Sequence, residues 1–142
     1  MDEKQREEYE KMQEKWIANI IAKELTPRGD LLPPWQRYPK LLGSSLGWKM
    51  GDGEAYMLAW DSWKSQMTQE QLVEYFKKYA PLPIEWLSWV ANRFGFNDAI
   101  AEMISGTGEF AGIHWLEEHG LASFHDFKLW HDEKMKRRTE KR

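Results

Sequence analysis

The chain has 142 residues, a hydrophobic fraction of 42% and a formal net charge of −3. This length suits one domain, and this apolar content is enough to build a core, so a globally disordered chain is not expected. The absence of cysteine excludes disulfides, iron–sulfur clusters, cysteine-based zinc sites and a cysteine nucleophile.

The beginning of the chain bears on localisation. Its first sixteen residues are mostly charged rather than apolar, so they do not resemble a secretory signal. No apolar run approaches the roughly 20 residues that a membrane span needs. We therefore expect a cytoplasmic protein with no membrane partner. No motif implies a cofactor, and we expect none.

A long helix is predicted over residues 3–25. Large apolar side chains recur in it at helical spacing: Tyr9, Met12, Trp16 and Ile20. The first turns are nearly all charged, so the N-terminal half is expected to project into solvent or to meet a second chain. A homo-oligomer formed through this helix is therefore one of the expected partners. Pro27 ends the helix, because a proline disfavours helical geometry in the residue before it.

Residues 26–52 show neither a helical nor a strand period and contain four prolines. Long segments of this kind are uncommon in compact domains and tend to be functional or disordered. Disorder would expose many large apolar side chains, so we predict an ordered, non-helical strap that lies across the helices. A short helical turn over residues 39–42 is compatible with this prediction.

The strap ends in the glycine-rich stretch GWKMGDGE at residues 47–54. Glycines permit positive φ and close approach of the backbone, and Lys49 lies among them. The stretch is weakly similar to an anion site at a helix N-terminus, but its spacing matches neither a P-loop nor a dinucleotide fingerprint. The simpler interpretation is that Asp52 caps the next helix and the glycines form the turn.

The rest of the chain is predicted to be helical. The expected segments are residues 54–66, 69–79, 84–94, 98–105, 109–119 and 123–138. Two of them carry the pattern W-x-S-W, at Trp60/Trp63 and Trp86/Trp89, and we expect these rings to pack into the core. No segment alternates in the way that a strand requires. The predicted fold is all-α: a single compact domain over residues 1–142, of about six helices, with the strap between the first two.

Charge is distributed unevenly. Residues 134–142 contain six cationic side chains and one carboxylate, so the rest of the chain is acidic. An acidic body repels phosphate, and nucleic acid is not expected as a partner apart from this tail. Cations suit the negative end of a helix dipole, so a frayed helix end is the simpler interpretation of the tail. An electrostatic handle for an acidic partner or RNA is the alternative.

No catalytic residue and no metal ligand is assigned. The chain lacks the SxxK and HExxH patterns. His114 with Glu117 or Glu118 has a spacing that can share a metal, but a solvated or capping histidine is the simpler interpretation. A metal-dependent hydrolase is therefore the weakest alternative, and a binding protein is favoured over an enzyme.

The candidate function rests on the nine tryptophans, several times what an average soluble protein carries. A core packed with large rings explains most of them, and the alternative is that some rings line a groove for a ligand or partner. We expect a small interaction or regulatory protein, of bacterial or phage type, that binds a protein partner through a Trp/Tyr/Pro-rich surface. The alternative is a small molecule or nucleotide stacked between rings, with Arg37, Lys49 or Arg93 at the phosphates. The predicted binding residues are Trp35, Arg37, Tyr38, Trp48, Lys49, Gly51, Asp52 and Gly53.

Overall fold

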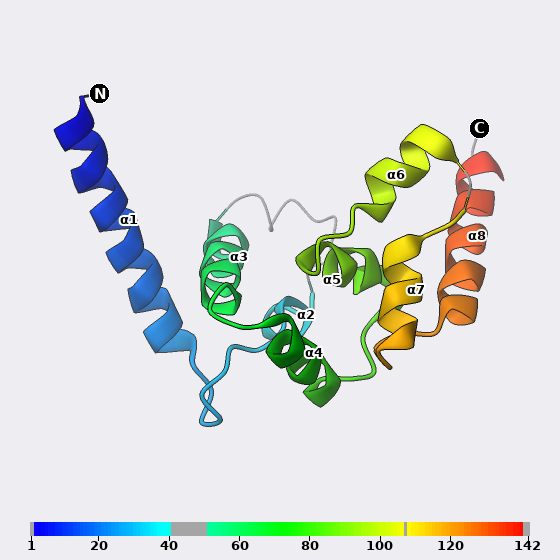
Figure 1. Ribbon diagram of the computed structural model, residues 1–142, viewed down its shortest axis with the longest axis horizontal. Coiled ribbons are helices and arrows are strands. Elements are labelled where there is room, and N and C mark those ends of the chain that lie inside the picture. Colours follow the sequence, from blue (N-terminus) through cyan, green and yellow to red (C-terminus); the bar gives the residue numbers. More distant parts are fainter. Residues whose placement is uncertain (1, 41–50, 107, 141–142) are drawn as a thin grey trace. The chain divides into compact units, whose positions relative to one another are not determined.

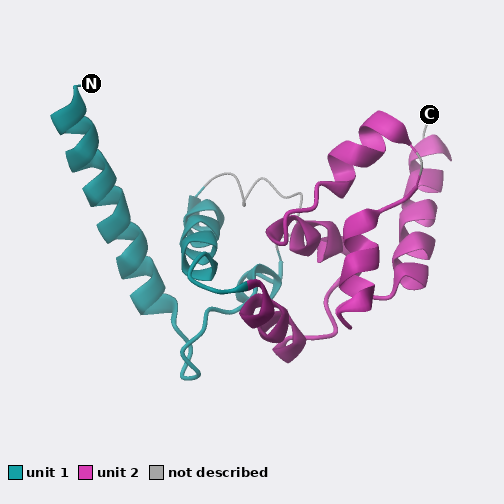
Figure 2. Ribbon diagram, in the orientation of Figure 1, with its two compact units in different colours: residues 1–68 teal, residues 69–142 magenta. Residues whose placement is uncertain are grey.

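The computed structural model describes residues 2–40, 51–106 and 108–140 (Figure 1). These residues form eight α-helices and contain no strand, which confirms the all-α prediction. The chain divides into two compact units, residues 1–68 and residues 69–142 (Figure 2). One domain over residues 1–142 stays a prediction. Across the described ranges, no helix combines the length and the apolar character needed to cross a membrane.

The first unit is organised by α1 (Glu3–Glu24), which packs against α3 (Gly51–Lys64). A capping box starts α1: the Asp2 carboxylate accepts from the Gln5 N–H at 2.8 Å, and the Gln5 side chain accepts from the Asp2 N–H at 3.1 Å. Leu25 ends the helix just before Thr26-Pro27, as the sequence predicts.

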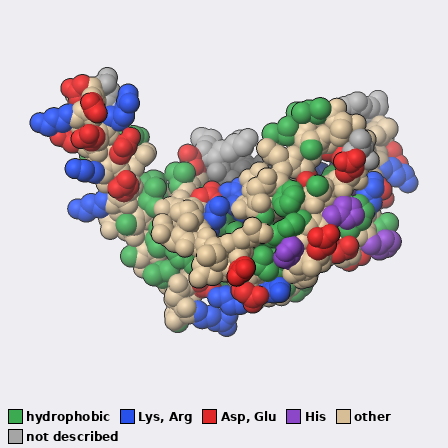
Figure 3. All heavy atoms as spheres, in the orientation of Figure 1, with side chains coloured by type: hydrophobic (Ala, Val, Ile, Leu, Met, Phe, Trp, Pro, Cys, Tyr) green, Lys and Arg blue, Asp and Glu red, His purple; other side chains and the backbone are tan. Residues whose placement is uncertain are grey.

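The N-terminal half of α1 has no cover within its own unit. Residues 2–16 are all exposed, no residue of the helix is buried, and its first turns extend past α3 (Figure 1). Acidic and basic side chains crowd this end of the helix (Figure 3). Packing on α3 therefore involves only the C-terminal half of α1.

A tight loop reverses the chain after α1. The Thr26 N–H donates to the Asp30 carbonyl at 2.8 Å, and the Thr26 hydroxyl donates to Oδ1 of Asp30 at 2.6 Å. Gly29 supplies the left-handed conformation at the tip, with φ of +83°. The loop delivers Leu31 into a fully buried position, which anchors the start of the strap.

The strap is less irregular than predicted. Pro34–Arg37 form the short helix α2, and Gly51 and Asp52 already belong to α3. The first difference has a local cause, because proline is favoured at the first position of a helix and Pro34 occupies it. The second difference means that Asp52 lies in the first turn of α3, so its predicted role as the N-cap is wrong. Helix α2 was not among the predicted helices, and the described residues form eight α-helices where about six were predicted.

The second unit contains α4 (Gln69–Lys78), the 3-10 helix η2 (Ile84–Trp86), α5 (Leu87–Arg93), α6 (Asp98–Ser105), α7 (Ala111–Glu118) and α8 (Phe124–Glu140). Helix α5 packs against α6, α7 and η2, while α8 packs against α7 and η2. Large buried side chains fill this unit: Phe76, Trp86, Val90, Ile113, Leu116 and Phe127.

The tryptophan rings of the two W-x-S-W patterns pack in the same way. The rings of Trp60 and Trp63 meet edge to face at 6.4 Å, and those of Trp86 and Trp89 at 5.4 Å. The first ring of each pair is buried and the second is half-buried. The core role predicted for these pairs therefore holds fully for Trp60 and Trp86.

The start of α7 is capped from another helix. Its N-cap residue, Phe110, has a left-handed backbone and no capping side chain. Instead, the buried Asp98 carboxylate of α6 accepts from the Gly112 N–H at 2.9 Å and from the Ile113 N–H at 3.1 Å. An anionic acceptor also suits the positive end of the helix dipole. Asp98 thus does for α7 what a local Ser or Asp does elsewhere.

Replacing the cap should weaken the whole unit. We expect Asp98→Ala to lower the free energy of unfolding by about 2 kcal/mol, because two buried N–H groups lose their acceptor. Urea unfolding followed by circular dichroism measures this. Glu109→Ala removes an exposed carboxylate nearby and should change stability by at most about 0.5 kcal/mol. Equal losses in the two variants would contradict the capping role.

Steric crowding favours glycine at position 112. A Cβ built at this position would lie 2.7 Å from Cβ of Phe96 and 2.8 Å from Cβ of Ala91. We therefore expect Gly112→Ala to destabilise the protein by about 1–3 kcal/mol, the usual cost of overpacking, although alanine favours helix. The same unfolding experiment measures it, with Ala111→Ser at the exposed neighbouring position as the control. A stability gain in Gly112→Ala would show that the neighbours yield easily.

Candidate functional site

Three of the predicted binding residues meet at one pocket in the first unit, which we call the Arg37 pocket. Its volume is about 320 Å³, and it is open to solvent on one side. Helix α1, the end of α2 and the first turns of α3 build its walls. The lining residues are Trp16, Ile20, Lys23, Glu24, Arg37, Tyr38, Asp52, Ala55 and Tyr56.

A two-point ion pair closes one wall. Arg37 donates from Nε to Oε2 of Glu24 at 2.7 Å and from a terminal nitrogen to Oε1 at 3.1 Å. This hydrogen bonding to Glu24 raises the pKa of Arg37 above its ordinary value. Partly exposed pairs stabilise a fold by at most about 1 kcal/mol. The planar, two-point geometry instead fixes where α2 sits against α1.

Contacts of the Tyr38 and Tyr56 rings connect α2 to α3. The Arg37 guanidinium lies 4.5 Å from the centroid of the Tyr38 ring, and that ring meets Tyr56 edge to face at 5.7 Å. The Tyr56 hydroxyl donates to the Leu32 carbonyl of the strap. The described part of the strap is therefore ordered at both ends, by α1 at Arg37 and by α3 at Leu32 and Tyr38.

The surroundings of Tyr38 raise the pKa of its phenol. Desolvation is the largest cause that raises its pKa above the ordinary value of 10.0, and the carboxylates of Asp52 and Glu24 act in the same direction. The Arg37 cation opposes them. The net effect is a raised pKa, so the phenol of Tyr38 stays neutral to a higher pH than an ordinary tyrosine does.

The remaining charges of the pocket are balanced. Glu24 and Arg37 neutralise each other, which leaves the Lys23 ammonium and the Asp52 carboxylate. Within the described residues, neither group makes an ion pair. The pocket thus offers one cation and one anion beside the Trp16 indole, with no excess of positive charge.

The other predicted binding residues are distributed differently. Trp35 is half-buried in α2 and is not among the residues that line the pocket. Gly51 is exposed at the start of α3, with φ of +71°, and Gly53 is buried inside that helix. Trp48 and Lys49 lie outside the described residues.

Sequence reasoning missed the contribution of α1. Trp16 and Ile20 belong to the predicted helical stripe, but nothing in the stripe indicates that its end faces the strap. Lys23 and Glu24 gave no signal at all, because charged residues near a helix end are common. Only the reversal of the chain through the loop at residues 26–30 brings Glu24 to Arg37.

Three of the four histidines pack against aromatic rings in the second unit. His114 stacks on Phe124 and His119 stacks on Trp115, each with ring centroids 3.8 Å apart. His131 packs edge to face against Phe110 at 4.9 Å. Among the residues whose structure is described, no group of three or more His, Asp or Glu could hold a metal ion. The metal-dependent alternative therefore gains no support from them.

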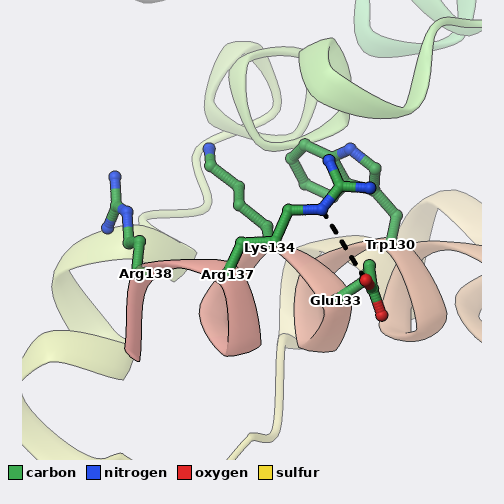
Figure 4. A pocket seen from close by; sticks show the side chains of 5 residues that line it. All are labelled: Trp130, Glu133, Lys134, Arg137 and Arg138. Carbon is green, nitrogen blue, oxygen red and sulfur yellow. Dashed lines mark ion pairs between the residues drawn. The ribbon is translucent and has the colours of Figure 1, made fainter. Parts of the chain in front are cut away.

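A second pocket, of about 380 Å³, lies along α8 (Figure 4). The Lys134 ammonium lies 5.0 Å from the centroid of the Trp130 ring, and Nε of Arg137 lies 3.6 Å from Oε1 of Glu133. Both cations therefore already have partners on their own helix. Residues 134–140 of the basic tail are helical and belong to α8.

We found no protein-family model, no curated protein and no solved structure that matches this chain. Function is therefore argued from the geometry of the pocket alone.

The pKa of Tyr38 has a consequence for stability. Because the folded pKa is raised, the unfolded chain ionises first, so the Tyr38 contribution is complete below about pH 10 and is lost as pH rises further. We expect the free energy of unfolding to fall more steeply above that pH in the native chain than in Tyr38→Phe. Urea titrations at several pH values measure this. Tyr9→Phe, at an exposed tyrosine, is the matched control, and identical slopes in all three proteins would contradict the assignment.

Proposed function

We propose that this protein binds a protein partner and that the Arg37 pocket receives a side chain of that partner. The carrying observation is the arrangement of Trp16, Arg37, Tyr38 and Asp52 around one preorganised hollow. Tryptophan, tyrosine and arginine are the residues that most often dominate binding energy at protein interfaces.

The charges of the pocket indicate what kind of side chain enters it. Asp52 is exposed and attracts a cation, and the indole of Trp16, which lines the same pocket, also favours one. Lys23 lies on the same pocket and attracts a carboxylate. A lysine or arginine of the partner, with an acidic neighbour, therefore fits better than a purely apolar anchor.

A nucleotide fits this geometry less well. Both available oxygens of Glu24 already engage Arg37, so that guanidinium would have to leave its partner to meet a phosphate. Asp52 adds a carboxylate that repels phosphate, and Lys23 is the remaining cation of the lining. Arg93, the other candidate, belongs to the second unit, where its guanidinium lies 4.4 Å from the Trp89 ring centroid.

The test starts from capture of a partner by the tagged full-length chain in the cells that produce it. The captured protein is then purified, and its affinity is measured by calorimetry for the native chain, Asp52→Asn and Tyr38→Ala. We expect each substitution to weaken binding at least about tenfold, equivalent to about 1.4 kcal/mol. Leu129→Ala, at an exposed position of α8, should leave the affinity unchanged.

Two outcomes would overturn the proposal. One is a captured protein that binds Asp52→Asn and Tyr38→Ala as tightly as the native chain, with circular dichroism showing all three folded. The other is a nucleotide that raises the melting temperature of the native chain but not of Arg37→Gln, which would favour the alternative function.

A further inference from the structure

The N-terminal half of α1 carries an apolar stripe that the chain itself leaves open. Tyr9, Met12 and Trp16 are 52%, 72% and 47% exposed, and their spacing of three and four residues places them on one face. We call them the α1 stripe. Half of a helix without tertiary cover is only marginally stable in water, because helical stability in proteins comes mostly from packing. A cover for this stripe would therefore order the helix as well as remove three large side chains from water.

We propose that a second copy of this chain covers the α1 stripe, in an antiparallel helix pair. Spacings of three and four define heptad positions, with Tyr9 and Trp16 at a and Met12 at d. When Tyr9 of one copy packs beside Met12 of the other, the two-fold axis repeats the same contact on the far side. Trp16 then covers the next layer at each end of the pair.

The charges beside the stripe are self-complementary in this orientation. Glu8 and Lys15 occupy the g positions, which face each other in an antiparallel pair. The register set by Tyr9 and Met12 brings Glu8 beside Lys15 of the second copy, and symmetry supplies the same ion pair again. Both side chains are exposed, and neither is ion-paired within the described part of the chain.

A parallel pair has no such complement. In that orientation, Glu8 would face Gln13 and Lys15 would face Ile20, so neither charge would meet its opposite. The two acidic ends would also lie together, since residues 2–10 carry five carboxylates and two cations. In the antiparallel pair this acidic half lies against residues 11–19, which carry two cations and one carboxylate.

The pair and the Arg37 pocket overlap at one residue. Only Trp16 belongs to both surfaces, and Lys23, Arg37, Tyr38 and Asp52 lie outside the helical register of the pair. Three large apolar side chains per copy make a contact that is small by the standard of stable dimers. The dimer should therefore form reversibly with increasing protein concentration.

Sedimentation of the full-length chain over a wide range of concentrations tests the pair. The native chain should show a monomer–dimer equilibrium. Glu8→Lys and Lys15→Glu should each raise the dissociation constant at least about tenfold, because two attractive pairs become two repulsive ones. The double variant Glu8→Lys/Lys15→Glu restores both ion pairs, and its dissociation constant should return to within about threefold of the native value.

Glu14→Lys makes the same change of charge on the opposite face of α1 and should leave the dissociation constant unchanged. A chain that stays monomeric at every concentration would overturn the proposal. So would a dimer that neither single variant weakens, one that Glu14→Lys weakens equally, or one that the double variant fails to restore. None of these three substitutions changes a residue that lines the Arg37 pocket, so partner capture by the pocket is scored separately.

Discussion

The first unit depends on the two-point contact between Glu24 and Arg37. Glu24 is the last residue of α1 and Arg37 is the last residue of α2, and the chain between them reverses direction. This contact joins α2 directly to α1. With it, Arg37 is held over the Tyr38 ring, Tyr38 is held against Tyr56, and α3 completes the pocket. A weakly stabilising surface pair thus sets the positions of most groups that line the candidate site.

Helix α1 serves the molecule in two ways along its length. Its C-terminal turns pack on α3 and provide one wall of the pocket, whereas its first four turns carry an open stripe of large side chains. The two regions meet at Trp16. If both proposals hold, dimer formation and partner binding would share this one indole, and each event would influence the order of the other's surface. The same helix would then link the state of assembly to the state of the pocket.

Most of the fold could be predicted from the helical spacing of apolar residues in the sequence. The helices of the second unit begin and end within a few residues of the predicted bounds, because capping residues, prolines and glycines mark them. The strap was harder, since α2 is a single turn and too short to show a period. The site was half predictable: Arg37, Tyr38 and Asp52 stood out by residue type and neighbourhood. Glu24 and Lys23 did not, because only tertiary structure brings them to the same hollow, and no local pattern encodes that approach.

The cap that Asp98 provides for α7 also constrains how this chain can change over evolutionary time. The donor, Gly112, and the acceptor, Asp98, lie 14 residues apart and belong to different helices. The start of α7 therefore depends on a residue of α6. Loss or replacement of α6 would remove the carboxylate that caps the start of α7, and an insertion that shifts α6 would have the same effect. A change that separates the two helices would therefore cost the protein both of these hydrogen bonds.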